Sequence, residues 1–524
     1  MSWTARLRVF NGIIPPRSHS LRYGDRADRR ALISARILAI SAVLSGVAYL
    51  LWLSLTVNRY HPWMSAAFVA AETYCFLLLV TASFTVWKLR YKPPEGLPLL
   101  EHPSVDVFVT VCGEPEPVLI ATLDAVRNIE WQGRLQIYVL DDGGQEWVRR
   151  AAHERGFCYL SRRTRNLPQG HAKAGNLNFG LERSNGEFVL VLDADQVTRP
   201  SILSALAGYM RFADVGFIQS RQLYFVPVGD PFFNLDPVFY DAVQLGYDDR
   251  DTALSCGSGV LYRRAALLEN GGFSQWNVIE DLTTSYDLHS RGWRSFYYPH
   301  ALTIGLAPAD IWGVYRQRGQ WALDTMRLFF WDNPLLKRGL RWPSRISYLV
   351  IPLAYAWAGL VFPLFFLIPL WTYVTGGSVL AGSELQFVIM RGIYGALMAF
   401  ALRNMFRRHH AGRQFQTLAG LFPVYLSGTI RALFYPPSRE SRYRPNNAPS
   451  GRKPPALLAV LPQIAVVAAN ALLPFYAIVQ GTAQPRLIVG NAVISALAIW
   501  TLIPVIAAAL GDKVWDRTLD PYAH

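Results

Sequence analysis

Charged side chains are scarce in this chain of 524 residues. Only 17% of the residues are Asp, Glu, Lys or Arg, against about 25% in ordinary soluble domains, whereas 52% are hydrophobic. This composition excludes a disordered or fibrous protein. It also disfavours a single compact soluble domain, because one hydrophobic core stops growing beyond about 250–300 residues.

Cysteine occurs only four times, and no two cysteines form a C-x-x-C pair. Such scattered cysteines indicate neither a disulfide framework nor a zinc site, and they fit a reducing cytosol or a bilayer. Acidic residues are outnumbered, at 37 against 51 Lys and Arg, so the formal net charge is +14. This basic balance is compatible with nucleic acid, an anionic membrane surface or a phosphate-bearing substrate.

Long apolar runs occur only towards the two ends of the chain. Crossing a bilayer takes about 20 apolar residues, and we identify six such runs: 37–57, 63–87, 346–374, 385–402, 457–479 and 487–510. We therefore expect six membrane spans, two before and four after a middle region of ordinary charge. The 36 residues before the first run are too many and too basic for a secretory signal.

Basic residues follow the expected membrane orientation. Eight arginines precede the first run, whereas the predicted outer loops 375–384 and 481–486 nearly lack Lys and Arg. The positive-inside rule then places the segment 1–36, the middle region 88–345, the loop 403–455 and the tail 511–524 in the cytoplasm. Because the positive charge lies at membrane flanks, we expect a lipid bilayer as a partner and no nucleic acid.

Two charges interrupt the apolar runs, Glu72 in the second and Arg391 in the fourth. Charges inside a membrane are costly and usually paired or functional. We expect that these two pair with each other or that one lines a tunnel; the alternative places Glu72 beside a water-filled vestibule without a partner. Residues 415–433 indicate an amphipathic helix at the membrane interface, with a packed core helix as the alternative.

The middle region alternates between two kinds of segment. The runs 105–111, 135–140, 188–192 and 215–218 are typical of buried strands, and the segments 121–127, 147–155 and 203–212 are typical of the helices between them. This alternation predicts an open α/β sheet. In such sheets ligands bind beyond the carboxyl ends of the strands.

Acidic residues follow two of these strands directly. Asp141 and Asp142 come after the run 135–140, and Asp193 and Asp195 come after the run 188–192. One acid at a strand end is often a turn former or helix cap, but two clusters in one sheet favour a site. Two carboxylates two residues apart can hold a hard divalent cation and leave positions for substrate phosphates. Lys173, between the clusters, can reach a phosphate.

Three further motifs lie downstream. Cys256 and Gly257 belong to a small-residue turn that suits close backbone approach to a ligand, although a plain loop would look the same. The acids at 280–281 are either favourable helix N-terminal charges or include a general base. The tryptophan that ends the segment 317–321 either stacks on a ring or anchors the chain at the interface.

In this order the motifs resemble those of the processive family 2 glycosyltransferases, particularly the bacterial cellulose synthases. The family order D-D-G, D-x-D, T-E-D and Q-x-x-R-W corresponds to residues 141–143, 193–195, 279–281 and 317–321. The resemblance implies a cytoplasmic α/β domain of GT-A-like fold at 88–345. This domain would be inserted between two pairs of membrane helices, at 37–87 and 346–402. An interfacial and gating-loop-like segment at 403–455, two further helices within 456–510 and the tail would follow.

The resemblance also implies residue roles. For the nucleotide sugar, it implies contacts from Asp142, Lys173, Asp193, Gln317, Arg318 and Gln320. For a metal ion, Mg²⁺ or Mn²⁺, it implies Asp195 together with Asp193. For catalysis, it implies Asp281 as the base with Glu280 beside it. For the acceptor sugar, it implies Trp321, Cys256 and Gly257.

Three departures from the family pattern stand out. Gln320 replaces the arginine that meets the diphosphate in the family, so either Arg318 substitutes or substrate handling differs. The segment 111–113 lacks the usual aromatic residue, and the loop 438–453 matches the family's gating loop poorly. Because the chain ends at His524, we expect no cyclic-di-GMP-binding domain after the last span.

The function implied by the resemblance is a processive, inverting glycosyltransferase of the bacterial inner membrane. It would polymerise glucose from UDP-glucose into a β-1,4- or β-1,3-glucan (cellulose-like or curdlan-like) and move the polymer through its own channel, with accessory export subunits as possible partners. The alternatives are a chitin- or hyaluronan-type synthase that uses another UDP-sugar, a non-processive enzyme that acts on a lipid-linked sugar, and a non-catalytic transporter.

Overall fold

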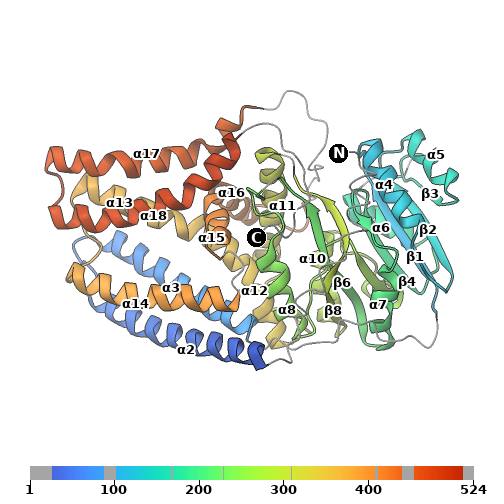
Figure 1. Cartoon of the computed structure of the whole chain (residues 1–524), viewed down its shortest axis with the longest axis horizontal. Coiled ribbons are helices and arrows are strands. Elements are labelled where there is room, and N and C mark those ends of the chain that lie inside the picture. Colours follow the sequence, from blue (N-terminus) through green and yellow to red (C-terminus); the bar gives the residue numbers. More distant parts are fainter. Residues whose placement is uncertain are drawn as a thin grey trace.

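The computed structural model describes residues 26–87, 102–165, 167–168, 170–227, 229–308, 310–406, 411–439 and 454–511. The molecule is elongated, with a sheet-containing part at one end and long helices at the other (Figure 1). Most of the basic N-terminus, the first residues of the middle region (88–101), nearly all of the loop 438–453 and the tail from 512 lie outside the described residues.

Eight strands of the described chain form one mixed sheet in the order β3–β2–β1–β4–β7–β6–β8–β5. Strands β1 to β4 run parallel in this half of the sheet, whereas β7 is antiparallel to both β4 and β6. The strands are β1 (Val105–Val111), β2 (Leu135–Asp141), β3 (Cys158–Leu160), β4 (Phe188–Asp193), β5 (Val197–Thr198), β6 (Val215–Phe225), β7 (Val260–Arg263) and β8 (Arg294–Leu306).

The four predicted strands are all present, as β1, β2, β4 and β6. The other four escaped prediction for local reasons. β3, β5 and β7 are only two to four residues long, and β8 contains Pro299 and several polar residues. Their place in the sheet comes from pairing with neighbours rather than from an apolar run of their own.

Helices cover both faces of the sheet. One face packs the odd-numbered residues of β1 against α4 (Glu116–Arg127), α5 (Glu146–Glu154) and α7 (Ile202–Leu206). The other face packs Phe108 of β1 among α6 (Ala172–Leu181), α9 (Arg264–Asn270) and α10 (Glu280–Ser290). All seven residues of β1 are buried, because both faces are covered. The predicted helix 203–212 is split into α7 and the 3₁₀ turn η1 (Ala207–Arg211).

Six segments of the described chain are helical, long and apolar enough to cross a membrane, as the sequence predicts. They lie side by side in two groups (Figure 1). The first group is α2 (Arg26–Leu55), α3 (Pro62–Thr85) and α14 (Glu384–Met405); the second contains α13 (Phe362–Thr375), α17 (Ala456–Gln480) and α18 (Pro485–Leu510). α12 (Trp342–Ala356) continues through the π-helical turn η3 (Trp357–Val361) into α13 as one 34-residue span.

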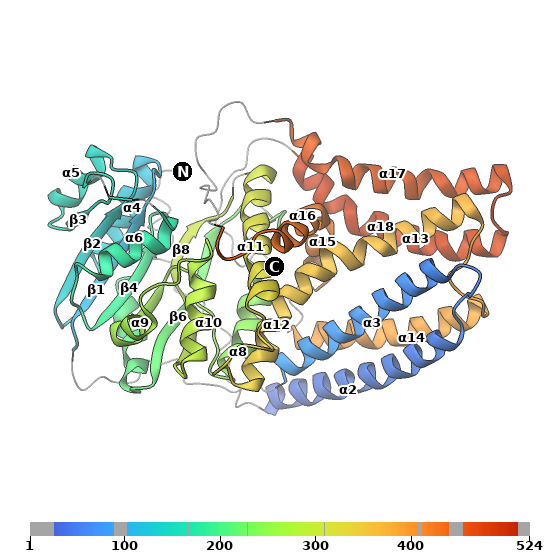
Figure 2. The same ribbon diagram turned by 180° about the vertical axis from the view of Figure 1, so that it is seen from behind.

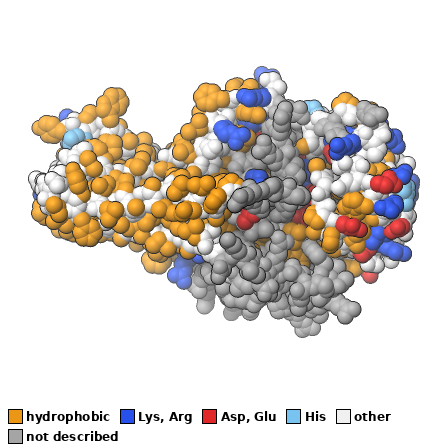
Figure 3. Space-filling model, turned by 90° about the horizontal axis from the view of Figure 1, so that it is seen from above, with side chains coloured by type: hydrophobic (Ala, Val, Ile, Leu, Met, Phe, Trp, Pro, Cys, Tyr) orange, Lys and Arg blue, Asp and Glu red, His pale blue; other side chains and the backbone are white. Residues whose placement is uncertain are grey.

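The outer surface of these helices is apolar. Hydrophobic side chains cover the helical arm in Figure 3, and most of the visible charged side chains lie towards the other end. Phe475, Val388 and Leu44 are 67%, 60% and 65% exposed. A surface of this extent needs an apolar environment, so the architecture is that of a multi-pass membrane protein.

The segment 415–433 differs from the single amphipathic helix that we expected. It forms two helices, α15 (Ala411–Gly420) and α16 (Phe422–Leu433), which are separated at Leu421 just before Pro423. Their apolar faces are buried against protein: Tyr425 packs with Trp357 and Val314. Figure 2 shows α16 beside α11 (Ile311–Trp331), the helix that stands between the sheet and the membrane helices.

The two intramembrane charges form an ion pair. Arg391 Nε of α14 lies 2.8 Å from Glu72 Oε1 of α3, and Glu72 is 1% exposed. The guanidinium group also lies over the ring of Tyr394, 5.5 Å from its centroid. The pairing expected from the sequence is therefore confirmed, and it joins two helices of the first group.

We predict that neutralising one member of this pair destabilises the protein more than neutralising both. Glu72→Gln or Arg391→Gln leaves an unpaired buried charge, which costs about 3–5 kcal/mol, whereas removal of both charges together is often close to neutral. Thermal unfolding of the purified protein in detergent measures the effect. If the loss of unfolding temperature in the double variant equals the sum of the two single losses, the prediction is contradicted.

Candidate functional site

The acidic clusters lie together at the carboxyl edge of the sheet. β2 and β4 flank β1 in parallel, with Val111 paired to Asp141 and Thr110 paired to Asp193. Parallel strands bring their carboxyl ends to one edge, and the residues just beyond them face the same cavity. The sheet topology therefore brings Asp142, Asp193 and Asp195 to one wall.

The two aspartates of the first cluster have different partners. Asp141 accepts hydrogen bonds from the backbone N–H groups of Gly143 and Gln145 and from the Tyr159 hydroxyl, so it shapes the turn. Burial raises the pKa of Asp141 despite these donors. Asp142 lines the cavity and binds Arg162 through two hydrogen bonds, of 2.9 and 2.5 Å. No motif in the sequence pointed to Arg162.

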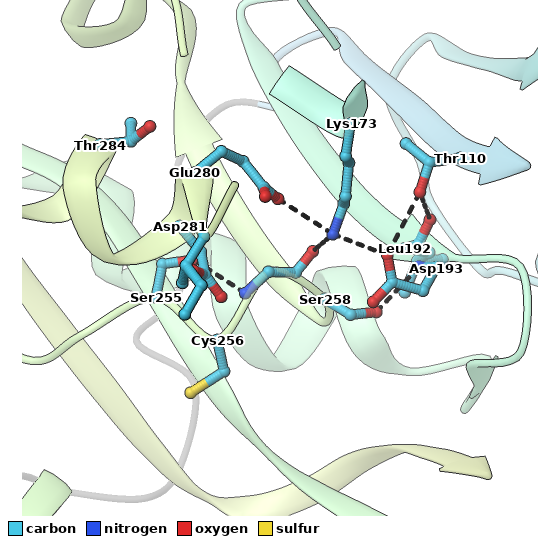
Figure 4. A network of polar contacts seen from close by, with 12 residues as sticks. Thr110, Lys173, Leu192, Asp193, Ser255, Cys256, Ser258, Glu280, Asp281 and Thr284 are labelled. Carbon is cyan, nitrogen blue, oxygen red and sulfur yellow. Dashed lines mark hydrogen bonds and ion pairs between the residues drawn. The ribbon is translucent and has the colours of Figure 1, made fainter. Parts of the chain in front are cut away.

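Lys173 occupies the centre of the site (Figure 4). Its Nζ lies 2.6 Å from Asp193 Oδ1 and 3.2 Å from Glu280 Oε1, and it donates to the Gly257 carbonyl oxygen at 2.7 Å. Burial lowers the pKa of Lys173, but the charges of Asp193 and Glu280 outweigh it and hold the pKa well above its usual value. The lysine thus joins the first turn of α6, the end of β4 and the start of α10.

Gly257 must be a glycine at this point for two reasons. Its φ of +78° lies in the left-handed region, which side chains other than glycine rarely adopt. A Cβ atom there would also lie 2.9 Å from Asp281 Oδ2 and 3.1 Å from Lys173 Nζ. The small-residue turn noted in the sequence therefore brings its backbone against the charged groups of the site.

The acids at 280–281 begin α10; Glu280 is buried and Asp281 is half-buried. Burial raises the pKa of Glu280, although the Lys173 ammonium opposes this. Burial and then the negative charge of Glu280 raise the pKa of Asp281. A carboxylate with a raised pKa is a better proton acceptor near neutral pH than an ordinary aspartate.

Asp193 and Asp195 meet the chemical demands of a divalent cation. Burial, followed by the negative charges of Asp193 and Glu114, raises the pKa of Asp195 to about 7. A bound cation would relieve this crowding of negative charge, and two carboxylates suit Mg²⁺ or Mn²⁺ when other positions go to phosphate and water. No group of three or more His, Cys, Asp or Glu in the described parts of the chain is arranged to hold a metal ion.

Two cavities meet at this site. The polar cavity, of about 860 Å³, lies at the carboxyl edge of the sheet and is lined by Asp142, Lys173 and the D-x-D acids. The apolar cavity, of about 430 Å³, extends between membrane helices and is lined by Leu78 of α3 and Met398 of α14. The residues common to both linings are Gln222, Tyr224, Cys256, Ile279, Asp281 and Trp321.

The segment 317–321 lies on α11, where its residues face different cavities. Gln317 and Gln320 line the polar cavity. Arg318 instead lines the apolar cavity, where its Nη1 lies 3.3 Å from Asp236 Oδ2 and its guanidinium group lies 4.8 Å from the Trp321 ring centroid. Arg318 thus lies on the wall of the other cavity, because consecutive helical residues point in different directions. Its contact with the nucleotide stays a prediction.

Gln320 is held by a buried network on the same helix. Its amide donates to Asp324 Oδ2 at 2.7 Å, and that oxygen also accepts the backbone N–H of Ile279. Arg327, which is fully buried, contacts Asp324 Oδ1 at 3.4 Å and donates to the carbonyl oxygens of Tyr435 and other residues of the segment 435–439. The network connects the turn before Asp281 to α11, and no sequence motif indicated it.

The chain is similar to known proteins over most of its length. Residues 102–323 match the family model described as "Glycosyltransferase like family 2", and residues 269–402 match the model described as "Cellulose synthase". The cellulose synthase catalytic subunit (UDP-forming) of Pseudomonas fluorescens is 30% identical over 407 residues, which are 73% of this chain and 54% of that protein. The corresponding protein of Xanthomonas axonopodis is 36% identical over 296 residues, or 54% and 40% of the two chains.

The chain thus spans about half or less of the length of these relatives. Among solved structures, a mannosyltransferase from Pyrobaculum calidifontis, in complex with GDP-mannose and Mn²⁺, aligns with a TM-score of 0.51. The alignment covers 71% of this chain and 99% of that chain at 16% sequence identity. This likeness concerns the fold alone.

We predict that Asp324→Asn destabilises the protein strongly. The substitution removes the carboxylate from a pair whose two side chains are both 0% exposed, and breaking a buried pair costs about 3–5 kcal/mol. Asp332→Asn is the matched control, because its pair with Lys337 is partly exposed, at 32% and 20% for the two side chains, and exposed pairs contribute about 1 kcal/mol or less. Equal unfolding temperatures for the two variants would contradict the prediction.

Proposed function

Within residues 102–402 the chain belongs to the family 2 glycosyltransferases, with the expected GT-A-like fold, and on that premise we propose that the protein is a processive β-glucan synthase. In this proposal it transfers glucose from UDP-glucose, with inversion, to the end of a growing β-glucan. The relatives that are named UDP-forming cellulose synthases favour a UDP-sugar donor and a cellulose-like product.

The observation that carries the proposal is the meeting of the two cavities at Asp281 and Trp321. A polar cavity with a lysine and an acidic cluster suits a nucleotide sugar, and an apolar cavity with aromatic side chains in its lining suits a glycan chain. The transferring carbon must lie where donor and acceptor touch. Asp281, Trp321 and Cys256 line that junction, which supports their expected roles as base and acceptor contacts.

The reaction that we propose is a single displacement. The acceptor hydroxyl attacks the anomeric carbon of the donor, Asp281 takes the hydroxyl proton, and the bond to the UDP oxygen breaks with inversion at that carbon. The raised pKa of Asp281 fits this work, since a stronger base is needed to accept a proton from a hydroxyl. Lys173 holds Glu280 and Asp193 in place on either side.

In the proposal Asp193 and Asp195 hold Mg²⁺ or Mn²⁺. The cation supplies positive charge that stabilises the leaving diphosphate. Asp142, Gln317 and Gln320 line the same cavity and complete the walls around the nucleotide.

The membrane helices give the polymer a route. The apolar cavity continues from Trp321 towards Leu78 and Met398, side chains of two helices that are apolar enough to cross a bilayer. We propose that the glucan enters the membrane region there, with the catalytic part on the cytoplasmic side, as the positive-inside rule favours. The bilayer is then the chain's partner, and any export subunits would act beyond it.

The pH dependence of the rate tests the base. Because Asp281 must be ionised and its pKa is raised by burial and by Glu280, we expect the rate to rise with pH across a range above the usual aspartate pKa. Glu280→Gln removes a negative charge and should move this acid limb to lower pH. Initial rates of UDP release from about pH 5 to about pH 9 measure the shift; an acid limb that does not move would contradict the assignment.

The product assay tests the function itself. Purified full-length protein with labelled UDP-glucose and Mg²⁺ should form an insoluble polymer, which β-1,4- and β-1,3-specific glucanases then distinguish. Asp281→Asn should lower the rate by about a hundredfold or more, whereas Asp287→Asn, on the same helix but paired with Lys337, should keep it. Turnover only with another UDP-sugar would point to a chitin- or hyaluronan-type enzyme. A lipid-soluble product would point to a non-processive enzyme. No turnover with any donor would point to a transporter.

A further inference from the structure

The polar cavity has more negative than positive charge. Among the described residues it is lined by six carboxylates but only three cationic side chains, Lys173, Arg316 and Arg431. Lys173 is already bound to Asp193 and Glu280. A nucleoside diphosphate adds further negative charge, so its phosphates need cationic partners other than Lys173.

Neither Arg318 nor Gln320 of the segment 317–321 offers a positive charge to the polar cavity. Gln320 lines the cavity, but it carries no charge and its amide donates to Asp324. Arg318 pairs with Asp236 on the wall of the apolar cavity. Besides the divalent cation of the proposed function, a cationic side chain for the phosphates must therefore come from another part of the cavity lining, where Arg316 and Arg431 are the two that remain among the described residues.

Arg431, near the end of α16, also lines the polar cavity. Its side chain is exposed and makes no hydrogen bond or ion pair with the rest of the described chain. An arginine that is both unengaged and directed to a cavity of this charge is available for a bound anion, and its planar fork suits two phosphate oxygens.

The backbone of α16 is held firmly against α11 around this arginine. A Cβ atom on Gly428 would lie 2.7 Å from the Cβ of Ala322, so the missing side chain lets the two helices approach closely. The Trp331 indole N–H donates to the Ala432 carbonyl oxygen at 2.9 Å, and Arg327 Nε donates to that of Tyr435 at 2.9 Å. These contacts hold the backbone around Arg431 in place without using its side chain.

We infer that Arg431 binds the diphosphate of the donor, in place of the arginine that is absent at position 320. The inference rests on the proposed function, since it takes the polar cavity to be the donor site. It assigns to α16 a direct part in donor binding in addition to its packing role. Arg431 is a binding residue in this assignment, and Asp281 remains the base.

The test compares nucleotides that differ by one phosphate. Binding of UDP and of UMP to the full-length protein in detergent, with Mn²⁺ present, is measured for the wild type and for Arg431→Gln. We expect the variant to bind UDP about tenfold or more weakly, because a charge-assisted hydrogen bond is lost, while UMP affinity changes less than about threefold. Arg431→Lys should lie between the two.

Three further variants make the test decisive. Arg403→Gln, an exposed arginine on α14 that lines neither cavity, controls for net charge and should leave binding unchanged. Gln320→Arg in the Arg431→Gln background should restore the preference for UDP over UMP, because it returns a guanidinium group to the cavity. Arg316→Gln removes the third cationic side chain of the polar cavity, and its UDP and UMP affinities are measured in parallel.

Several outcomes would overturn the inference. Unchanged UDP affinity in Arg431→Gln, an equal loss for UDP and UMP, or a loss confined to Arg316→Gln would each remove Arg431 from the diphosphate site and leave the proposed function intact. Wild-type protein that binds neither UDP nor GDP would instead remove the donor site itself, and the proposed function with it.

Discussion

The arrangement of the site depends on one cation, the half-buried Lys173 ammonium between Asp193 and Glu280. Buried charges are tolerated only when they are paired and hydrogen-bonded, so the lysine draws together three elements that are distant in sequence. Asp193 and Glu280 form ion pairs with this lysine. Burial and then the charges of neighbouring carboxylates raise the pKa values of Asp195 and Asp281. These raised values are what support the proposed roles of Asp195 at a metal ion and of Asp281 as a proton acceptor.

Helix α11 connects this chemistry to the membrane part. It carries Trp321 at the junction of the cavities, binds the turn before Asp281 through Asp324, and holds the segment 435–439 through Arg327. The polar cavity, the proposed base and the entrance to the apolar cavity therefore share one support. If the enzyme is processive, as we propose, the acceptor must return to the same position after each transfer, and a shared support keeps that position relative to Asp281 constant.

Local patterns predicted the larger elements well. The apolar runs identified six membrane helices and four strands, and the acids after β2 and β4 marked the carboxyl edge of the sheet. Prediction failed where structure depends on distant partners. β8 follows its parallel neighbour β6 through several irregularities in register. The segment 415–433 divides at Leu421, because each half packs on a different neighbour: Gln416 donates to the Trp500 carbonyl oxygen of α18, and Gly428 contacts α11.

The sequence by itself determined which residue types stand at the strand ends, which segments are apolar enough for a bilayer, and the order of the motifs, since these are local properties of composition and spacing. Only the tertiary structure decided their partners: Asp142 with Arg162, Gln320 with Asp324, Arg318 with Asp236, and Glu72 with Arg391. Local spacing does not encode such pairings, because an ion pair or hydrogen bond depends on the distance and direction between two atoms. For residues far apart in the chain, both are set by the packing of whole helices and strands.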